Sequence, residues 1–544
     1  MDFNLSQVVH AVADTIGDRE AIVDANRRYT YRQFMDRCDR LSAYFVSEGL
    51  GAHSERSALQ GHESGQDHLA IYMHNCIEYI EAMMGAYGAR IAPFNVNYRY
   101  VADELRYLLN DSKATAIVYH SAFAPLLDEV RSELPNLRVL LQVPDDSSNA
   151  LLDGARWYED ATSNAPEVEL PTPSPDDLYI LYTGGTTGMP KGVLWRQGDI
   201  YPGALGGRKI STGIEYADLA EICENAAAGG MKVFPAAPFM HGAAHWMAIN
   251  ALGNGNTIVL PEQTKSFDPV DACNTIQKEG VNLMLIVGDA FGRPLLDEIK
   301  TGKYDLSSLM LLISGGAALS APVKAAILEA LPSVAIMDGL GSSETGQQAS
   351  QVIGAGAPVT TGTFNPGTGM AIVSEDFDRV LEAGHEEPGW LAQRGRVPLG
   401  YLGDAEKTAR TFPTINGERF SVPGDRARLR ADNVLELFGR DSVTINSGGE
   451  KIFAEEVEAA IAHHPAVYDV IVAGRPSERW GNEVVAIVRL RDGQTATADE
   501  LLSEAGQHIA RYKLPKEIIF TDTIVRSPAG KADYRWARSV AEGN

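Results

Sequence analysis

Three stretches of the chain share one pattern, in which a short apolar run leads directly into a loop of glycine, serine and threonine. The apolar runs are residues 178–182, 309–313 and 334–337. Short apolar runs bounded by glycine are typical of buried strands. Ligands in layered α/β sheets gather at the carboxyl ends of strands. We therefore expect a binding site where these three loops lie.

Helical and strand patterns alternate along the chain ahead of these runs. Residues 31–45 have the spacing of an amphipathic helix, and residues 69–73 form the apolar run of a buried strand. Residues 51–67 are polar enough for an exposed loop, and residues 164–177, rich in proline and acids, resemble a linker. The alternation predicts an α/β fold with a large layered N-terminal domain, in which sheets are flanked by helices.

The chain is too long for a single compact core, because 544 residues exceed the usual size of one domain. From about Gly439 the pattern changes to a compact α+β arrangement. We predict helices over residues 454–462 and 498–510, and strands over residues 468–473 and 483–490. A domain boundary is therefore expected directly after Gly439.

Charge and cysteine content exclude several classes of partner. The chain carries 47 lysines and arginines against 72 aspartates and glutamates, a net charge of −25 that repels phosphate backbones, so no nucleic acid is expected. Its four cysteines form no CxxC motif. The N-terminus lacks the lysines of a signal peptide, and no apolar run approaches the ~20 residues of a transmembrane segment. A cytoplasmic protein is predicted.

The first of the three loops, residues 183–192, indicates a cradle for phosphate. Its glycines let backbone N–H groups turn toward an anion, while hydroxyls and a lysine add donors and charge. A P-loop ATPase or kinase is disfavoured, because Pro190 stands before the lysine and Gly192 after it. A flexible hinge would explain the glycines but not the threonines and lysine. The candidate phosphate ligands are Thr183, Gly184, Gly185, Thr186, Thr187 and Lys191.

Residues 182–192 resemble the phosphate-binding signature of the adenylate-forming superfamily of acyl-CoA synthetases, luciferases and peptide-synthetase adenylation domains. Further motifs follow in the family's order, and the resemblance extends from about residue 31 to residue 531. It implies that His241 borders the acyl pocket, that Glu344 is a catalytic residue and Mg²⁺ ligand, and that Thr183 also lies at the metal. The implied ATP contacts from the other two loops are Gly315, Asp338, Gly339, Leu340 and Ser343, with Leu340 in place of the usual aromatic residue.

The same resemblance covers the predicted domain boundary. It implies that Asp425 binds the ribose, that Arg440 binds nucleotide, and that Lys531 enters the site only for adenylation. Ser442 stands at the hinge position, where the family usually has aspartate or lysine. The implied domains are residues 1–439, a hinge at 440–442, and a mobile C-terminal domain at 443–544. A glycine loop lining the tunnel for coenzyme A would contribute Ser447, Gly448 and Gly449.

The resemblance implies ligation of a carboxylic acid to coenzyme A, with ATP and Mg²⁺, through an acyl adenylate. The patterns in residues 51–67, 95–100 and 445–451 are similar to actinobacterial acyl-CoA synthetases of fatty-acid and steroid-side-chain breakdown, so a medium, long or branched acyl chain is predicted. Two alternatives share the motifs: an acyl-AMP ligase that loads a separate carrier protein, and a non-catalytic nucleotide-binding regulator. No carrier domain is expected within this chain, and the oligomeric state, including a homodimer, stays open.

Overall fold

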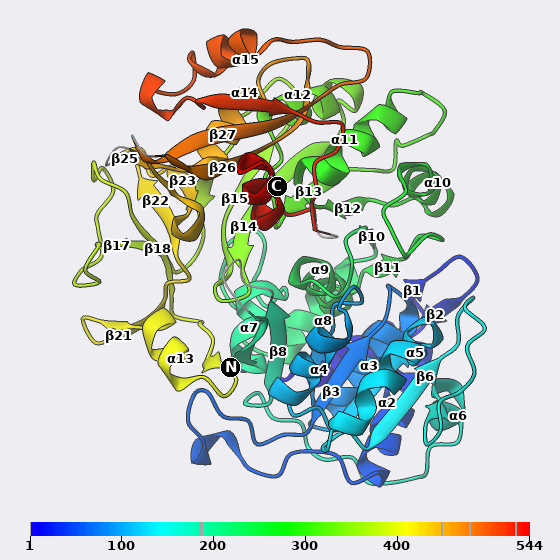
Figure 1. Ribbon diagram of the computed structural model, residues 1–544. Coiled ribbons are helices and arrows are strands. Elements are labelled where there is room, and N and C mark those ends of the chain that lie inside the picture. Colours follow the sequence, from blue (N-terminus) through cyan, green and yellow to red (C-terminus); the bar gives the residue numbers. More distant parts are fainter. Residues whose placement is uncertain (1, 184–188, 448–449, 478–479, 528–529, 544) are drawn as a thin grey trace.

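The computed structural model describes residues 2–183, 189–447, 450–477, 480–527 and 530–543 (Figure 1). A large N-terminal domain, drawn from blue to yellow, carries a small C-terminal domain in orange and red. Helices and strands are mixed throughout the described chain, so the predicted α/β class is confirmed.

A parallel sheet of five strands lies in the first part of the chain, in the order β4-β3-β5-β6-β7. Its strands are β3 (His68–Tyr72), β4 (Ala92–Asn95), β5 (Ala116–His120), β6 (Val139–Val143) and β7 (Arg156–Trp157). The helices of this part are α1 (Leu5–Ile16), α2 (Tyr31–Ser47), α3 (Ile77–Gly88), α4 (Ala102–Asp111), α5 (Ala124–Val130) and α6 (Tyr158–Ser163).

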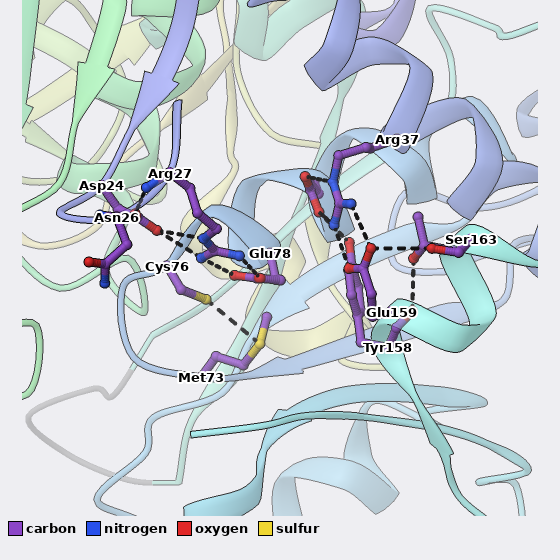
Figure 2. A network of polar contacts seen from close by, with 12 residues as sticks. Asp24, Asn26, Arg27, Arg37, Met73, Cys76, Glu78, Tyr158, Glu159 and Ser163 are labelled. Atoms are coloured by element: carbon purple, nitrogen blue, oxygen red, sulfur yellow. Dashed lines mark hydrogen bonds and ion pairs between the residues drawn. The ribbon is translucent and has the colours of Figure 1, made fainter. Parts of the chain in front are cut away.

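Helix α3 is buried along its whole length, and its two carboxylates need partners there. Arg27 contacts Glu78, and it also donates to Asp24 at 2.8 Å. Arg37 donates to Glu81 at 2.5 Å, and the Tyr158 hydroxyl donates to the same carboxylate at 2.9 Å. Figure 2 shows two separate groups of contacts, with Arg27 beside Asp24 and Glu78 on the left and Arg37 near Tyr158 and Glu159 on the right. These pairs let a helix with charged residues occupy the core between α2 and the parallel sheet.

The largest sheet has a parallel part from β1 to β14, flanked by the antiparallel strand β2 on one side and by antiparallel strands on the other. Strands β1, β11, β10, β12, β13 and β14 pair in parallel, and the strands from β14 onward pair antiparallel. In sheet order the strands are β2 (Arg28–Thr30), β1 (Glu20–Val23), β11 (Thr257–Val259), β10 (Lys232–Pro235), β12 (Leu283–Ile286), β13 (Leu311–Gly315), β14 (Ala335–Ser342), β15 (Gly346–Ile353), β16 (Thr363–Pro366), β23 (Leu435–Arg440), β22 (Asp425–Leu429), β18 (Gly389–Arg394), β21 (Glu418–Ser421) and β20 (Thr414–Ile415), with β17 (Met370–Val373) beside β18.

The helices that accompany this sheet precede or connect its strands. They are α7 (Gln197–Ala204), α8 (Leu219–Ala228), α9 (Gly242–Gly253), α10 (Pro269–Glu279), α11 (Gly288–Ile299), α12 (Ala321–Ala330) and α13 (Ala405–Thr411). One continuous apolar core joins α1, α2 and α3 to residues of α9, α10 and α11. The two sheets of the N-terminal domain therefore share a common interior.

A third sheet contains the strand before the phosphate loop. Strand β8 (Leu178–Thr183) pairs antiparallel with β9 (Lys191–Arg196), which pairs with β19 (Gly400–Tyr401). The sequence pattern treated β8, β13 and β14 alike, but only β13 and β14 are neighbours in one parallel sheet. The turn after β14 nevertheless contacts the third sheet, because Trp195 on β9 donates to the carbonyl of Ser343 at 2.8 Å.

The C-terminal domain has its own sheet and its own apolar cores. Its strands run in the order β25-β24-β27-β26, with β28 pairing in parallel with β27. They are β24 (Ile445–Ser447), β25 (Glu450–Ile452), β26 (Val467–Ser477), β27 (Gly481–Leu490) and β28 (Glu517–Phe520), packed with α14 (Ala454–Ile461), α15 (Ala498–Ala505) and α16 (Tyr534–Ala541).

Most of the predicted elements are confirmed within a few residues, but two predictions are wrong. The expected loop from Asp338 is the second half of β14, because this segment pairs with β13 on one side and β15 on the other. The helix predicted to residue 510 ends at Ala505, directly before Gly506, a weak helix former. Residues 164–177 contain no helix or strand, as predicted, and residues 51–67 contain one short 3₁₀ turn.

Candidate functional site

The phosphate loop joins two paired strands. Thr183 ends β8 directly opposite Lys191 at the start of β9, so the residues between them connect an antiparallel pair. Gly184, Gly185, Thr186 and Thr187 lie outside the described residues. The structure therefore places both ends of the predicted cradle, at the edge of the three-stranded sheet.

Lys191 already has a carboxylate partner. Its Nζ lies 2.9 Å from Asp111 at the end of α4, and the Tyr182 hydroxyl donates to the same carboxylate at 2.9 Å. Burial opposes the charge of this lysine, but the bonds to Asp111 and Tyr107 outweigh that effect and raise the pKa of Lys191. The predicted phosphate cation is thus held in place and largely neutralised by a residue that the sequence did not indicate.

Glu344 lies in the turn between β14 and β15, where only 9% of it is exposed. The Tyr401 hydroxyl donates to its Oε1 at 2.9 Å, and the Ser421 hydroxyl donates to its carbonyl at 2.6 Å. These contacts orient the carboxylate and leave its second oxygen for a cation. No local pattern in the sequence linked Tyr401 to this position, because the two residues are 57 positions apart.

The predicted adenine contacts lie on two adjacent strands. Gly315 on β13 is paired with Gly339 on β14, so neither of these neighbouring strands carries a side chain at this position. Asp338 contacts the Nζ of Lys324, a lysine of α12 with no exposed surface, which also donates to the carbonyl of Thr360 at 2.8 Å.

Sequence analysis missed Lys324, although a signal was present. It lies on the buried stripe of α12 with Ile327 and Leu328, where a charged residue needs a partner. Leu340, two positions beyond Asp338 on β14, is partly buried against a small apolar cluster around Phe364.

The predicted ribose contact also lies on paired strands. Asp425 begins β22 and Arg440 ends β23, and their side chains form an ion pair with an Nε–Oδ1 distance of 3.0 Å. The attraction of Asp425 is the largest influence on Arg440 and raises the pKa of its guanidinium. Both residues predicted to hold the nucleoside are therefore brought together at the boundary of the two domains.

Lys531 reaches this region from the C-terminal domain. Gly530 packs against α11, where an added Cβ would lie 2.9 Å from that of Ala290. The Lys531 Cε lies 3.9 Å from the position of a Cβ on Gly316, beside the predicted adenine turn. Loss of bulk solvent and then the charge of Arg440 lower the pKa of Lys531, while Glu344 and Asp425 oppose the shift.

His241 is a neutral ring close to this lysine. Burial, followed by the charge of Lys531, lowers the pKa of His241 to about 3. Its Nε2 is buried and has no hydrogen-bond partner among the described residues. An orphaned donor or acceptor of this kind is costly, so the ring suits a site that a substrate's polar group completes.

The residues predicted for the hinge and for coenzyme A lie at the start of the C-terminal domain. Ser442 is part of a 3₁₀ turn, Asp441–Val443, which follows β23 directly. Ser447 ends β24 and pairs with Gly481 inside the C-terminal sheet. Gly448 and Gly449 lie outside the described residues.

A protein-only metal cage is absent from the described part of the chain. No group of three or more histidines, cysteines and acids is arranged there to hold an ion. A magnesium site built from Glu344 and substrate phosphates fits this finding, because Mg²⁺ is usually held by one or two carboxylates together with phosphate oxygens. Within the described residues, no helix is both long and apolar enough to cross a membrane.

The structure thus combines a large α/β domain with a small domain whose Lys531 lies beside Gly316 of the large one. The AMP-binding enzyme family pattern matches residues 9–402, and the AMP-binding enzyme C-terminal domain pattern matches residues 456–531. The chain therefore belongs to the AMP-binding enzyme family.

Named relatives cover nearly the whole chain. The medium-chain acyl-CoA ligase Mig of Mycobacterium avium is 56% identical over 541 residues, which is 99% of this chain and 98% of the relative. The 3-oxocholest-4-en-26-oate–CoA ligase of Rhodococcus rhodochrous is 38% identical over 547 residues, covering 99% and 96%. The crystal structure of the anthranilate CoA ligase AuaEII with anthranoyl-AMP has the same fold, with a TM-score of 0.84, 22% identity and coverage of 99% and 97%.

Proposed function

We propose that this protein is an AMP-forming acid–CoA ligase. The observation that carries the proposal is the position of Lys531, whose Cε lies beside Gly316 and whose ammonium group is close enough to Glu344, Asp425 and Arg440 for their charges to shift its pKa. Gly316, Glu344 and Asp425 belong to the large domain, Arg440 to the predicted hinge and Lys531 to the small domain. A cation delivered to a nucleotide site by a second domain suits a reaction in which negative charge develops at phosphate.

The first half-reaction joins the acid to ATP. A carboxylate oxygen attacks the α-phosphorus, the bond to the β-phosphate oxygen breaks, and pyrophosphate leaves. Asp425 and Arg440 orient the nucleoside and Lys531 stabilises charge at the α-phosphate. Mg²⁺, when bound by Glu344 and Thr183, supplies charge neutralisation at the phosphates. The buried, neutral His241 faces the reacting carboxylate without competing for its negative charge.

The second half-reaction transfers the acyl group. The thiol of coenzyme A attacks the acyl carbonyl, the bond to the AMP oxygen breaks, and the thiol proton passes to solvent. We propose that the small domain turns about residues 440–442 between the two steps, so that Lys531 leaves and the loop at Ser447, Gly448 and Gly449 enters. Support comes from the separate sheet and cores of the domain after β23.

We propose a medium-chain, long-chain or steroid side-chain acid as the substrate. The relatives named for such acids support this, with identities from 38% to 56% over nearly complete chains. The names of these relatives also favour coenzyme A over a carrier protein as the acceptor. A cytoplasmic location and a homodimer stay predictions.

Pyrophosphate exchange with a panel of acids tests the proposal. Purified protein, Mg·ATP and labelled pyrophosphate are incubated with medium-chain, long-chain, steroid side-chain and aromatic acids, and label in ATP is measured. Exchange with the first three classes is expected, followed by AMP release that depends on coenzyme A. A rate of AMP release that does not depend on coenzyme A would favour the carrier-loading alternative. The absence of exchange with all of the acids would favour the regulator.

A further inference from the structure

A second lysine stands close to the predicted phosphate site. Lys407 lies on α13, whose N-cap residue Asp404 accepts a bond from the Lys407 backbone N–H at 2.9 Å. Its Nζ lies over the ring of Tyr401, 4.1 Å from the centroid. Because the Tyr401 hydroxyl donates to Glu344, a single aromatic ring separates the ammonium group from the carboxylate expected to hold Mg²⁺.

Lys407 differs from Lys191 in its counter-ion. Lys191 is paired with Asp111 at 2.9 Å, whereas no carboxylate of the described residues forms an ion pair with Lys407. Burial lowers the pKa of Lys407, and the charges of Lys191 and Arg410 lower it further. Glu344 and Asp404 oppose the shift, but Asp404 is occupied in capping the helix and Glu344 lies behind the tyrosine.

The charged form of Lys407 is destabilised by this arrangement unless an anion binds beside it. A half-buried ammonium group with two cations in its surroundings gains more from a polyanion than a lysine that is already neutralised. The ring beneath it holds the charge in place by a cation–π contact, so little side-chain entropy is lost on binding. The polyanion expected at Glu344 is the triphosphate of ATP.

We infer that Lys407 binds the β- and γ-phosphates of ATP and holds the pyrophosphate that leaves. The inference rests on the proposed function, because it takes the cleft to be an ATP site. The two lysines then have different roles. Lys407 has no carboxylate partner among the described residues, so its charge is available to phosphate, whereas Lys191 is oriented by Asp111. Glu344, at the hydroxyl of Tyr401, and Lys407, over the face of the same ring, would together contact Mg·pyrophosphate.

A purely structural role is the alternative. The contact between Lys407 and Tyr401 could serve only to fasten α13 to β19. In that case removing the charge would disturb Tyr401 and Glu344, and would weaken ATP and pyrophosphate only when Mg²⁺ is present, because Glu344 is the expected Mg²⁺ ligand. A direct contact to phosphate weakens both ligands with or without Mg²⁺, so measurements in both conditions separate the two roles.

The experiment compares ATP with AMP. Binding of AMP, and of ATP and pyrophosphate each with and without Mg²⁺, to the wild type, Lys407→Met and Lys407→Arg is measured by calorimetry, with Arg410→Met as the control from the same helix. Lys407→Met should weaken ATP and pyrophosphate about 10- to 100-fold, the usual range for a hydrogen bond to a charged group, and leave AMP unchanged. Lys407→Arg should recover most of the loss, and Arg410→Met should stay close to the wild type.

Two results would overturn the inference. A loss of ATP and pyrophosphate affinity that appears only with Mg²⁺, or equal losses for ATP and AMP, would assign Lys407 a structural role, and unchanged affinity for ATP and pyrophosphate would remove it from the site. Thermal melting of each variant without ligand checks that the fold is retained. Failure of the proposed function is a separate result, since a wild type that binds ATP but performs no pyrophosphate exchange still permits the comparison of ATP with AMP.

Discussion

The two domains contribute to the cleft in different ways. On the large domain, Glu344 is held by Tyr401, and Asp425 pairs with Arg440 across two strands. On the small domain, the Lys531 ammonium group has no hydrogen bond or ion pair within the described residues. Only the backbone of Lys531 is bonded: its N–H donates to the Ser527 hydroxyl at 3.1 Å, and its carbonyl accepts from the Ser527 N–H at 2.8 Å. Groups needed throughout a reaction can be fixed in place, whereas a group needed for one step must be free to leave.

The strongest test of this difference between the domains replaces Lys531, whose ammonium group is not held by any bond within the described residues. Lys531→Ala should slow pyrophosphate release from acid and ATP by about 10²–10³, the usual worth of a contact to charge that develops in the transition state. Thioester formation from a preformed acyl adenylate should be nearly unchanged, because that step does not use the lysine. Both half-reactions are measured by rapid quench. Equal slowing of both steps would mean that the small domain does not exchange positions.

Substitution of Glu344, which is held in place on the large domain, should affect the Mg²⁺ dependence of the reaction. Glu344→Gln keeps the shape but removes the charge that binds a hard cation, so the adenylation rate should fall about 100-fold at ordinary Mg²⁺ concentrations. Activity is measured across a Mg²⁺ titration. Tyr401→Phe, which leaves Glu344 charged but without its hydroxyl donor, should have a smaller effect in the same direction. Wild-type Mg²⁺ dependence in the glutamine variant would remove Glu344 from the metal site.

The stability of the protein should depend on pH through Glu455, which lies at the contact between the two domains. An added Cβ on Gly439 would overlap the Glu455 carboxylate, so α14 rests directly on β23. Burial, then the charges of Glu458 and Asp425, raise the pKa of Glu455 to about 8. The folded protein therefore keeps a proton that the unfolded chain, with a pKa of about 4.3, has released.

The sign of the stability change follows from this difference. The contribution is fully present below the unfolded pKa and is lost as pH rises toward about 8, so the free energy of unfolding should fall over this interval. Glu455→Gln, which cannot ionise, should lose less stability than the wild type between about pH 5 and pH 9. Denaturant unfolding at several pH values measures this. Parallel pH profiles of the two proteins would show that Glu455 is ionised in the folded state.

The smallest effect is expected at the lysine that is already paired. Lys191→Ala should raise the KM for ATP by only about 3- to 10-fold, because Asp111 neutralises much of its charge. Steady-state kinetics and thermal melting are compared with those of Lys191→Ala/Asp111→Asn, which removes both charges and should restore lost stability. A larger loss than that of Lys407→Met would reverse the parts assigned to the two lysines.

Much of the site was accessible from sequence because its residues are grouped in short motifs. Thr183 and Lys191 do stand at the two ends of one loop, and Gly315 and Gly339 lie on adjacent strands. The hairpin-like geometry at β8 was not accessible, because a short apolar run has the same pattern in a parallel and an antiparallel sheet. The end of β14 was missed since glycines at 339 and 341 suggest a loop, whereas neighbouring strands on both sides hold the segment extended.

The sequence by itself determined the kind of chemistry, because glycines, hydroxyls and charges at fixed short spacing have the same capacity to bind phosphate in any fold that exposes them. Only the tertiary structure decided which charged side chains are paired with another residue and which are not. Lys191 meets Asp111 across 80 positions, Lys324 meets Asp338 across 14, and Tyr401 meets Glu344 across 57. A charge acts through its distance to other charges in space, and that distance is set by packing rather than by order along the chain.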